Sequence, residues 1–225
     1  IQKDNLKSYQ LALACDPISA FGGIVSCNFK ITRSLASELS NIFLEVIVAN
    51  GFDAEALKVL KKKKNLRLID ASKFKMSNLT KFNSINEAFL AQTEDLEPFC
   101  VKDFKIVSKK KPTKSQLKNL IFAFNVCRHV KSNAIVLASN GVTVGIGSGQ
   151  PSRLDSCQIA IDKMNKFQNF KDDIVAASDA FFPFVDGIEK LVQSGITAII
   201  QPSGSIRDKE IIKFANQTNT VLVFS

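Results

Sequence analysis

The chain has 225 residues, of which 45% are hydrophobic and 23% charged, a composition typical of a globular protein with its own core. No apolar run approaches the ~20 residues that a membrane-spanning helix needs, and no signal-peptide pattern is present. Five cysteines, an odd number without a CxxC pair, argue against a disulfide framework and a cysteine-rich zinc site. We therefore expect reduced thiols and a cytoplasmic protein.

The net charge of +9 suits anionic partners such as phosphates, folate carboxylates or nucleic acid. Much of the excess lies in two lysine runs, Lys61–Lys64 and Lys109–Lys111, whose simplest interpretation is solvated surface. Neither a zinc-finger spacing nor an RNA-binding aromatic motif accompanies them. We expect small-molecule partners, with no nucleic acid and no membrane.

Short apolar runs and stretches of helical periodicity alternate along the chain. In chain order they predict a helix around 6–13, strand 23–25, a helix around 35–43, strand 46–49, helix 54–64, strands 66–69 and 105–107, helix 115–131, strands 134–138 and 143–146, helix 153–167, strand 174–176, helix 187–194, strand 198–201, helix 209–217 and strand 221–224. Strands alternating with helices predict an α/β fold.

Residues 71–112 differ from the rest, because they are polar, weakly periodic and rich in Lys, Ser, Thr and Asn. They predict a long connection between a first α/β lobe, residues 1–70, and a second lobe, residues 113–225. A structureless connection of this length would be unusual. We therefore expect it to hold a short strand or helix, or to lie along a partner surface.

Two segments place glycines beside predicted strands. In Asp16–Gly23, two adjacent glycines precede a strand, which allows close approach of a ligand to the backbone or simply forms a tight turn. In Val144–Arg153, a glycine-rich turn leads into a helix, with Pro151 suited to its first turn. Backbone N–H groups, the positive helix end and Arg153 would form an anion cradle. The segment fails the dinucleotide-binding pattern GxGxxG at Gln150.

Two later segments also follow predicted strands. Ser178–Asp186 contains three phenylalanines and a proline between carboxylates, which would suit a flat heteroaromatic ring such as a pterin. The alternative is a packed turn in which Asp186 only caps a helix beginning at Gly187. Gln201–Asp208 is a loop of small residues between a strand and a helix. Because α/β proteins bind ligands at the carboxyl ends of strands, these junctions together indicate a binding site.

The single histidine, His129, lies at a predicted helix end, where a cap or a surface group is the usual role. No nucleophile elbow accompanies it, and the zinc-deaminase signature is absent from the sequence. A general base is therefore poorly provided for within this chain.

Six stretches, in this order, resemble the formyltransferase (AICAR transformylase) domain of a bifunctional purine-biosynthesis family, whose members also carry an inosine monophosphate cyclohydrolase domain. They are Asp16–Ile24, Phe43–Phe52, Lys131–Ile135, Gly145–Arg153, Ser178–Asp186 and Pro202–Asp208. The resemblance covers nearly the whole chain. It implies two lobes similar to cytidine deaminase without a zinc site, no metal, and a homodimer with sites at its interface.

The resemblance also implies the reaction. A formyl group passes from the cosubstrate 10-formyltetrahydrofolate to the 5-amino group of 5-aminoimidazole-4-carboxamide ribotide during IMP biosynthesis. Positions that match ribotide contacts of the family are Gly22, Glu45, Asn133, Arg153 and Phe181. Positions that match folate contacts are Leu154, Asp186, Ser205 and Ile206.

Some family features are missing or changed. The catalytic Lys-His pair belongs to a KHxxPxG-type motif, expected before the position where this chain begins, and no residue here matches it. A basic tail is expected after the chain's last residues, so both lobes are expected to be incomplete. Asn50 stands where the family commonly has proline, and Val185 where it has arginine. We expect the chain alone to be inactive; the alternative is a non-catalytic α/β fragment that binds folate or nucleotide.

Overall fold

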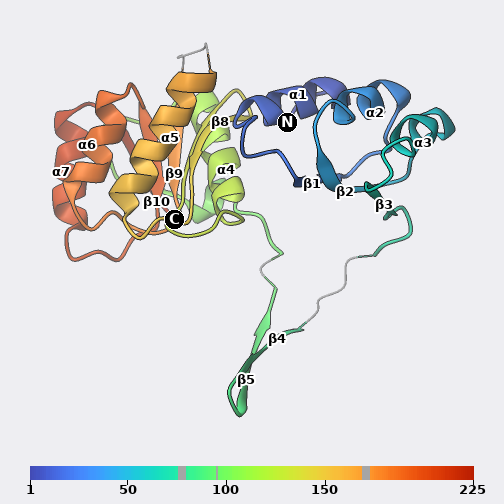
Figure 1. Ribbon diagram of the computed structural model, residues 1–225. Helices are drawn as coiled ribbons and strands as arrows, with labels where there is room; N and C mark the ends of the chain where they lie inside the picture. The colour runs from blue at the N-terminus through green and yellow to red at the C-terminus, as the bar shows by residue number, and fades with distance from the viewer. Residues whose placement is uncertain (76–79, 95, 169–172) are drawn as a thin grey trace. The chain divides into compact units, whose positions relative to one another are not determined.

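Helices and strands alternate in the computed structural model, which describes residues 1–75, 80–94, 96–168 and 173–225 (Figure 1). The chain divides into two compact units. Unit 1 comprises Ile1–Ala20 and Phe99–Ser225, and unit 2 comprises Phe21–Pro98. This division differs from the predicted lobes, because the first twenty residues group with the C-terminal part of the chain.

The centre of unit 1 is a mixed sheet of six strands in the order β6-β11-β10-β9-β7-β8. These are β6 (Lys105–Ile106), β7 (Ile135–Ser139), β8 (Val142–Gly147), β9 (Val175–Ser178), β10 (Ala198–Gln201) and β11 (Val221–Phe224). Strands β9, β10 and β11 run parallel, and β7 runs antiparallel to both of its neighbours, β8 and β9. The amino end of β7 therefore meets the carboxyl ends of β8, β9 and β10 at one edge of the sheet.

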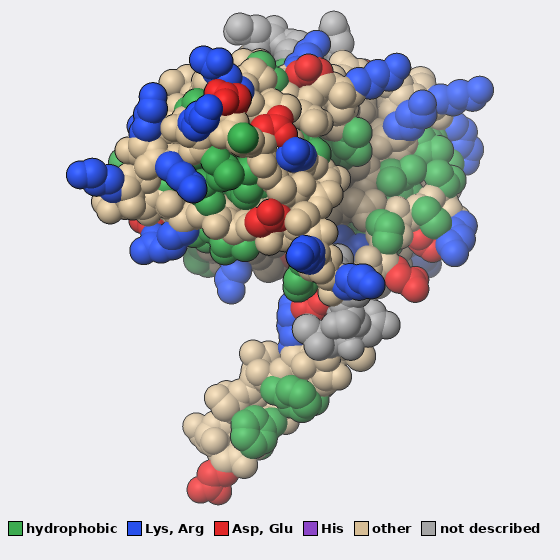
Figure 2. All heavy atoms as spheres, turned by 90° about the vertical axis from the view of Figure 1, so that its right-hand side faces the viewer, with side chains coloured by type: hydrophobic (Ala, Val, Ile, Leu, Met, Phe, Trp, Pro, Cys, Tyr) green, Lys and Arg blue, Asp and Glu red, His purple; other side chains and the backbone are tan. Residues whose placement is uncertain are grey.

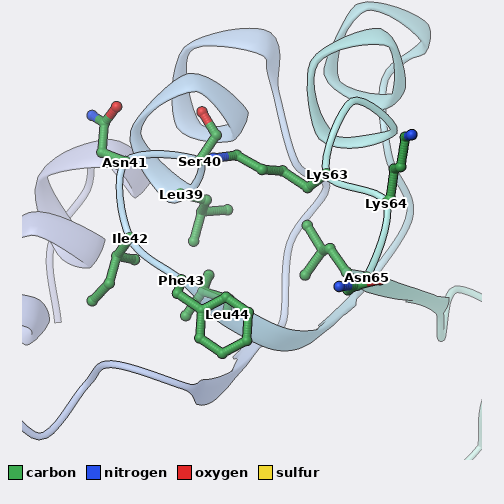
Figure 3. A pocket seen from close by; sticks show the side chains of 10 residues that line it. Leu39, Ser40, Asn41, Ile42, Phe43, Leu44, Lys63, Lys64 and Asn65 are labelled. Carbon is green, nitrogen blue, oxygen red and sulfur yellow. The ribbon is translucent and has the colours of Figure 1, made fainter.

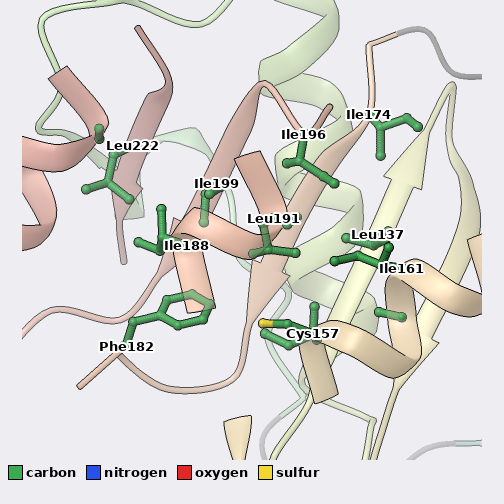
Figure 4. Close-up of a cluster of buried hydrophobic side chains, with 14 of the residues drawn as sticks. Leu137, Cys157, Ile161, Ile174, Phe182, Ile188, Leu191, Ile196, Ile199 and Leu222 are labelled. Carbon is green, nitrogen blue, oxygen red and sulfur yellow. The ribbon is translucent and has the colours of Figure 1, made fainter. Parts of the chain in front are cut away.

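Helices cover both faces of this sheet (Figure 1). The helices of unit 1 are α1 (Asn5–Ala14), α4 (Lys114–Cys127), α5 (Arg153–Phe167), α6 (Val185–Gln193) and α7 (Asp208–Gln217), with a short 3-10 helix at Val101–Asp103. Side chains alternate along β7: Leu137 packs with α5 and α6, whereas Val136 packs with α4 on the opposite face. Figure 4 shows the buried cluster around Leu137, where Ile161, Ile188 and Leu191 meet the sheet. Unit 1 is thus a three-layer α/β/α structure.

Contacts within unit 1 explain why its first residues belong there. Lys163 on α5 binds the carboxylate of Asp16 at 2.5 Å. The Gln168 amide donates a hydrogen bond to the carbonyl of Ala14 at 2.8 Å. The N-terminal ammonium group of Ile1 donates to the carbonyl of Gly141, in the turn between β7 and β8. Both ends of α1 are therefore tied to the β8–α5 region.

Unit 2 contains a three-stranded parallel sheet in the order β1-β2-β3. Its strands are β1 (Gly23–Cys27), β2 (Leu44–Ala49) and β3 (Arg67–Asp70), and its helices are α2 (Arg33–Leu39) and α3 (Ala54–Leu60). Leu35 and Leu39 of α2 are buried together with Ile47 of β2 and Leu60 of α3. This small apolar core holds the helices against the sheet.

A β-hairpin within unit 2 was not predicted as such. Its strands are β4 (Thr80–Ile85) and β5 (Ala88–Thr93), and all of their residues are exposed. The rings of Phe82 and Phe89 are 68% and 75% exposed, and Figure 2 shows hydrophobic side chains along this arm. The expectation that residues 71–112 contain a short regular element is confirmed by β4, β5, β6 and the 3-10 helix.

The predicted elements agree closely with the observed ones in unit 1. Helix α5 and strands β10 and β11 have the predicted bounds. The helices expected to reach residues 43, 64 and 131 end earlier, at Leu39, Leu60 and Cys127. Among the described residues, no helix is long and apolar enough to cross a membrane.

Candidate functional site

A pocket of about 540 Å³ opens in unit 1 at the edge where β8 and β9 end and β7 begins. Its lining residues are Asn133, Pro151–Leu154, Ala180–Phe184, Asp186 and Gly187. They come from three junctions: the turn before β7, the start of α5, and the segment from β9 to α6. The topology therefore brings together predicted residues that lie up to about fifty positions apart, including Asn133, Arg153 and Phe181.

Arg153 is the centre of a hydrogen-bond network on one wall of the pocket. Its Nη1 lies 2.5 Å from Asp179 Oδ1 and donates to Ser178 Oγ at 2.8 Å. Its Nη2 donates to Asn133 Oδ1 at 2.8 Å. The Asn133 amide nitrogen in turn donates to the carbonyl oxygens of Gln150 and Pro151, at 2.8 and 3.0 Å. Both predicted ribotide residues of this wall are thus held in one orientation.

Asp179 connects this network to the backbone. Its carboxylate accepts hydrogen bonds from the N–H of Ala134, at 2.9 Å, and from the hydroxyl of Ser132. Burial pulls the pKa of Asp179 upward, but the hydrogen bonds from Ser132, Arg153 and Ala134 outweigh burial, so the pKa lies below its usual value. Asp179 is therefore a carboxylate at neutral pH, and it forms an ion pair with Arg153.

Two helices begin at the pocket. Helix α5 has Ser152 as its N-cap, whose hydroxyl accepts a hydrogen bond from the N–H of Asp155, and helix α6 has Phe184 as its N-cap. The first N–H groups of a helix have no partner within the helix, and they carry the positive end of its dipole. Two such ends at one pocket favour an anionic or electron-rich ligand group.

These helix starts correct two predictions. Pro151 lies before the N-cap of α5 and not in its first turn. Helix α6 begins at Val185, so Asp186 stands inside its first turn and is not the N-cap residue. The Asp186 carboxylate accepts a hydrogen bond from the N–H of Gly187 at 2.7 Å, and Asp186 also lines the pocket.

The three phenylalanines after β9 have different environments. Phe181 and Phe184 are 40% and 51% exposed at the pocket. The ring of Phe182 is buried and packs beside Ile188 in the core (Figure 4). Of the predicted aromatic slot Phe181–Phe184, Phe181 and Phe184 offer exposed ring surface at the pocket, whereas the ring of Phe182, which also borders it, belongs mainly to the core.

The fourth predicted segment reaches the pocket through an arginine. The guanidinium of Arg207 lies 4.7 Å from the centroid of the Phe184 ring, a cation–π contact. Ser205 and Ile206 are not among the residues that line the pocket. Ile206 is fully exposed, and the Ser205 hydroxyl accepts a hydrogen bond from the N–H of Arg207. The link between these two predicted folate residues and the pocket is their neighbour Arg207.

The glycines of the segment before α5 have a packing role. A Cβ atom on Gly147 would lie 1.9 Å from the carbonyl oxygen of Ser156, and one on Gly145 would lie 2.2 Å from that of Ala160. Helix α5 therefore packs directly on the backbone of β8. The N–H of Gly149 is used in a hydrogen bond to the carbonyl of Lys131. Of the predicted anion cradle, the helix end and Arg153 remain, whereas the glycines serve helix–strand packing.

Gly22 and Glu45 lie in unit 2, on segments that do not line this pocket. Gly22 has a φ of +72°, which suits a turn, and its N–H donates to the carbonyl of Phe43 at 2.9 Å, just before the paired strands β1 and β2. Glu45 is half-exposed and binds Arg67 at 3.0 Å. Glu45 also lines an exposed recess of about 410 Å³, together with Phe43 and 64–67.

A second pocket in unit 2, of about 260 Å³, lies between the turns that follow α2 and α3 (Figure 3). Leu39 and Leu44 form an apolar wall of this pocket, and Lys63 and Lys64 also line it. None of the predicted site residues lines it. The pocket of unit 1 is therefore the better candidate.

The buried cysteine thiols and the single histidine do not add a nucleophile or a base to this pocket. Burial raises the pKa of the Cys127 and Cys157 thiols to about 12, so neither is a thiolate at neutral pH. His129 is exposed beyond the end of α4 and does not line the pocket. Within the described parts of the chain, no three His, Cys, Asp or Glu side chains are grouped as metal ligands.

Sequence reasoning missed Asp179 and its partners Ser132 and Ser178. Asp179 belongs to the Ser178–Asp186 motif, but the predicted contacts of that motif were Phe181 and Asp186. Its position directly after β9, at the edge of the sheet where the other predicted residues lie, becomes informative only once the strand pairing is known.

Comparison with known proteins shows which family the chain belongs to. A family model described as AICARFT/IMPCHase bienzyme matches residues 1–163. The chain is 45% identical to the bifunctional purine biosynthesis protein PurH of Rhodospirillum rubrum, over 98% of the chain and 44% of that protein. It is 43% and 44% identical to the PurH proteins of Aquifex aeolicus and Persephonella marina, each over 97% of the chain and 42% of the relative. The chain thus spans less than half the length of these relatives. It belongs to the AICARFT/IMPCHase bienzyme family.

Proposed function

We propose that this chain supplies the substrate pocket for formyl transfer from 10-formyltetrahydrofolate to the 5-amino group of 5-aminoimidazole-4-carboxamide ribotide, in purine (IMP) biosynthesis. The main support is that five predicted contact residues, from both substrate sets, line one pocket in unit 1: Asn133, Arg153, Leu154, Phe181 and Asp186. Membership of a family of purine-biosynthesis bienzymes supports the same reaction.

The chemistry of the pocket fits two substrates that meet there. The half-exposed rings of Phe181 and Phe184 offer flat apolar surface for a pterin, and the Asp186 carboxylate can accept hydrogen bonds from ring N–H groups. On the other wall, Arg153 and Asn133 offer a fixed guanidinium and amide for the polar groups of the ribotide. Phe181, between the two sets, is proposed to contact both substrates.

The transfer itself needs groups beyond this pocket. The 5-amino nitrogen attacks the formyl carbon, the new C–N bond forms, and the bond from that carbon to the folate nitrogen breaks. The amine must lose a proton to a base, the leaving nitrogen must gain one, and donors must hold the tetrahedral oxyanion. In the family a Lys-His pair performs these tasks, and its motif has no match in the 225 residues. We therefore propose that this chain alone binds substrates without turnover.

We also propose the remaining properties that the resemblance implies. Gly22 and Glu45 are proposed as ribotide contacts, and Ser205 and Ile206 as folate contacts. The active protein is proposed to be a cytoplasmic homodimer with sites at its interface, and its lobes to be similar to cytidine deaminase. The mixed sheet of unit 1, which has helices on both faces, supports the last proposal.

The second candidate function is binding without catalysis of folate or nucleotide by an α/β fragment. The observation that favours it is the missing Lys-His motif together with a pocket that retains its binding groups. In that case the chain would saturate with ligand but would not contribute to turnover in any longer protein.

Formyl transfer distinguishes the two candidates. The 225-residue chain is assayed alone, and then as a fusion that adds the preceding part of the Rhodospirillum rubrum relative with its Lys-His motif. We expect no turnover from the chain alone and turnover from the fusion. An active fusion should lose activity when Arg153 is replaced by Ala. A folded fusion that binds both substrates without turnover would favour binding alone, and one that binds neither would refute both candidates.

A further inference from the structure

Asp179 holds the chain on both sides of Asn133. Its carboxylate accepts a hydrogen bond from Ser132, the residue before Asn133, and one from the N–H of Ala134, the residue after it. The same carboxylate pairs with Arg153 at 2.5 Å. One side chain outside the pocket lining thus contacts Arg153 and the residues on both sides of Asn133.

Arg153 has a particular need for this partner. It is the first residue of α5, where the helix dipole is positive and a cation is unfavourable. Its side chain is only 10% exposed, and that of Asp179 is 16% exposed, so solvent screens the pair weakly. Without the carboxylate, a long side chain with many rotamers would turn toward solvent. Asp179 therefore offsets both the unfavourable position and the cost of ordering Arg153.

The orientation passes on to Asn133. Its amide nitrogen donates to two backbone carbonyls, and its amide oxygen accepts from Arg153. If Arg153 turns away, the Asn133 amide oxygen loses its donor. If the Asp179 carboxylate is removed, Ser132 and the N–H of Ala134 lose their acceptor as well.

We infer that Asp179 is a positioning residue of this pocket, whose carboxylate sets the orientation of Arg153 and, through it, of Asn133. The identity of the ligand in this inference rests on the proposed function. The orientation of Arg153 and Asn133 rests on the hydrogen bonds of Asp179 alone. It deepens that function by adding a residue that does not line the pocket.

The geometry can be tested without any ligand. The side-chain Nε–H signal of Arg153, assigned by comparison with Arg153→Lys, is recorded by NMR in the 225-residue chain and in Asp179→Asn. The matched control is Asp162→Asn, because Asp162 is an exposed carboxylate on the same helix, α5, with one partner, Gln158. We expect the signal to broaden or move to the position of a solvated arginine in Asp179→Asn and to stay unchanged in Asp162→Asn. An unchanged signal in Asp179→Asn overturns the inference.

Ligand binding tests the consequence. Calorimetric titration with the ribotide should give an affinity about 10-fold or more weaker for Asp179→Asn, as expected when a charge-assisted network is broken, and wild-type affinity for Asp162→Asn. Equal affinity in wild type and Asp179→Asn contradicts the positioning role. If the wild-type chain binds no ribotide, the proposed function fails, and the Arg153 signal still decides the geometric inference.

A second variant, Ser132→Ala, keeps the inference testable if Asp179→Asn does not fold. It removes one hydrogen bond to the same carboxylate and leaves the ion pair in place. We expect a smaller weakening of ribotide binding than in Asp179→Asn, at an unchanged melting temperature. A Ser132→Ala chain whose Arg153 signal and affinity both equal wild type, beside an unfolded Asp179→Asn, would show that Asp179 serves folding alone.

Discussion

Asp16 shows how one residue near the start of the chain is tied to unit 1. Its carboxylate accepts hydrogen bonds from Lys163 at 2.5 Å and from the N–H of Ser19 at 3.0 Å. Burial pulls the pKa of Asp16 upward, but the bonds from Lys163 and Ser19 outweigh it and lower the pKa to about 2. The folded state therefore prefers the ionised form.

The pH dependence of stability follows from this pKa. Because an unfolded Asp titrates near ~4, the contribution of Asp16 is full above that pH and is lost as pH falls toward about 2. Asp16→Asn should lower the free energy of unfolding by ~1 kcal/mol at pH 7, a value kept small by partial exposure. Urea unfolding at pH 7 and pH 2.5 measures both proteins, and we expect the difference to shrink at the lower pH. A difference that is the same at both values contradicts the assignment.

Gly187 and Phe182 form a pair at the base of the pocket. A Cβ atom on Gly187 would lie 2.6 Å from two atoms of the Phe182 ring. Gly187→Ala should therefore destabilise unit 1 by ~1–3 kcal/mol through overpacking. In a Phe182→Leu background the smaller side chain relieves this clash, so the added cost of Gly187→Ala should fall. A double-mutant cycle on unfolding free energies measures the coupling, and strict additivity of the two changes would count against the contact.

At the scale of elements, the close packing of α5 on β8 fixes the position of the α5 N-terminus. Because a Cβ on Gly147 would lie 1.9 Å from the backbone oxygen of Ser156, the helix must move if Gly147 becomes Ala. We expect Gly147→Ala to destabilise the chain by ~3 kcal/mol and to displace the Arg153 hydrogen bonds. Melting temperature and the Arg153 Nε–H signal measure the two effects. A stable variant with the wild-type signal would refute this account of the glycine-rich segment.

The backbone amides of the hairpin β4–β5 are expected to be less protected from hydrogen exchange than those of the central strands. An isolated two-stranded hairpin is only marginally stable in water, and all the residues of its strands are exposed. We expect its backbone amides to exchange with deuterium within seconds, whereas those of β9 and β10, which are fully buried, should exchange through global unfolding. Hydrogen exchange followed by mass spectrometry checks this. Strong protection of residues 80–93 would mean that another surface covers the hairpin.

Much of the element order could be predicted from apolar patterning, and the failures have physical causes. Strands buried on both faces, such as Val221–Phe224, appear as continuous apolar runs and were predicted with the correct bounds. Helices α2, α3 and α4 end before the predicted residues, because apolar or basic side chains continue beyond the last helical turn. The hairpin was missed because neither of its strands, TKFNSI and AFLAQT, shows the strict alternation of polar and apolar residues that marks a half-buried strand.

The site was predictable only in part. Asn133, Arg153 and Phe181 could be found from motifs, and strand topology then brings them together. Asp179 could not be singled out, because its role depends on β7 running antiparallel to β9, which places Ser132 and Ala134 beside it. The glycines before α5 looked like a ligand cradle, since sequence alone does not distinguish close helix packing from anion binding.

At the scale of the whole molecule, the chain forms two units, and the strongest candidate site lies in one of them. Unit 1 unites the first twenty residues with the C-terminal part of the chain through α1, a grouping that no composition shift indicates. Lys and Arg side chains are spread over the visible surface and do not gather at one place (Figure 2). The net charge of +9 therefore gives a general preference for anions, and the pocket supplies the specificity.

The most direct test of this account is to map where the ribotide binds, by NMR titration of the isotope-labelled 225-residue chain. The account predicts that amide signals at 132–134, 152–154 and 181–187 shift on addition of the ribotide, and that Arg153→Ala weakens the binding about 10-fold or more. Signals at 39–42 and at Lys63, around the second pocket, serve as the internal control. Shifts confined to those control residues, or full affinity in Arg153→Ala, would contradict the central claim that the pocket of unit 1 is the substrate site.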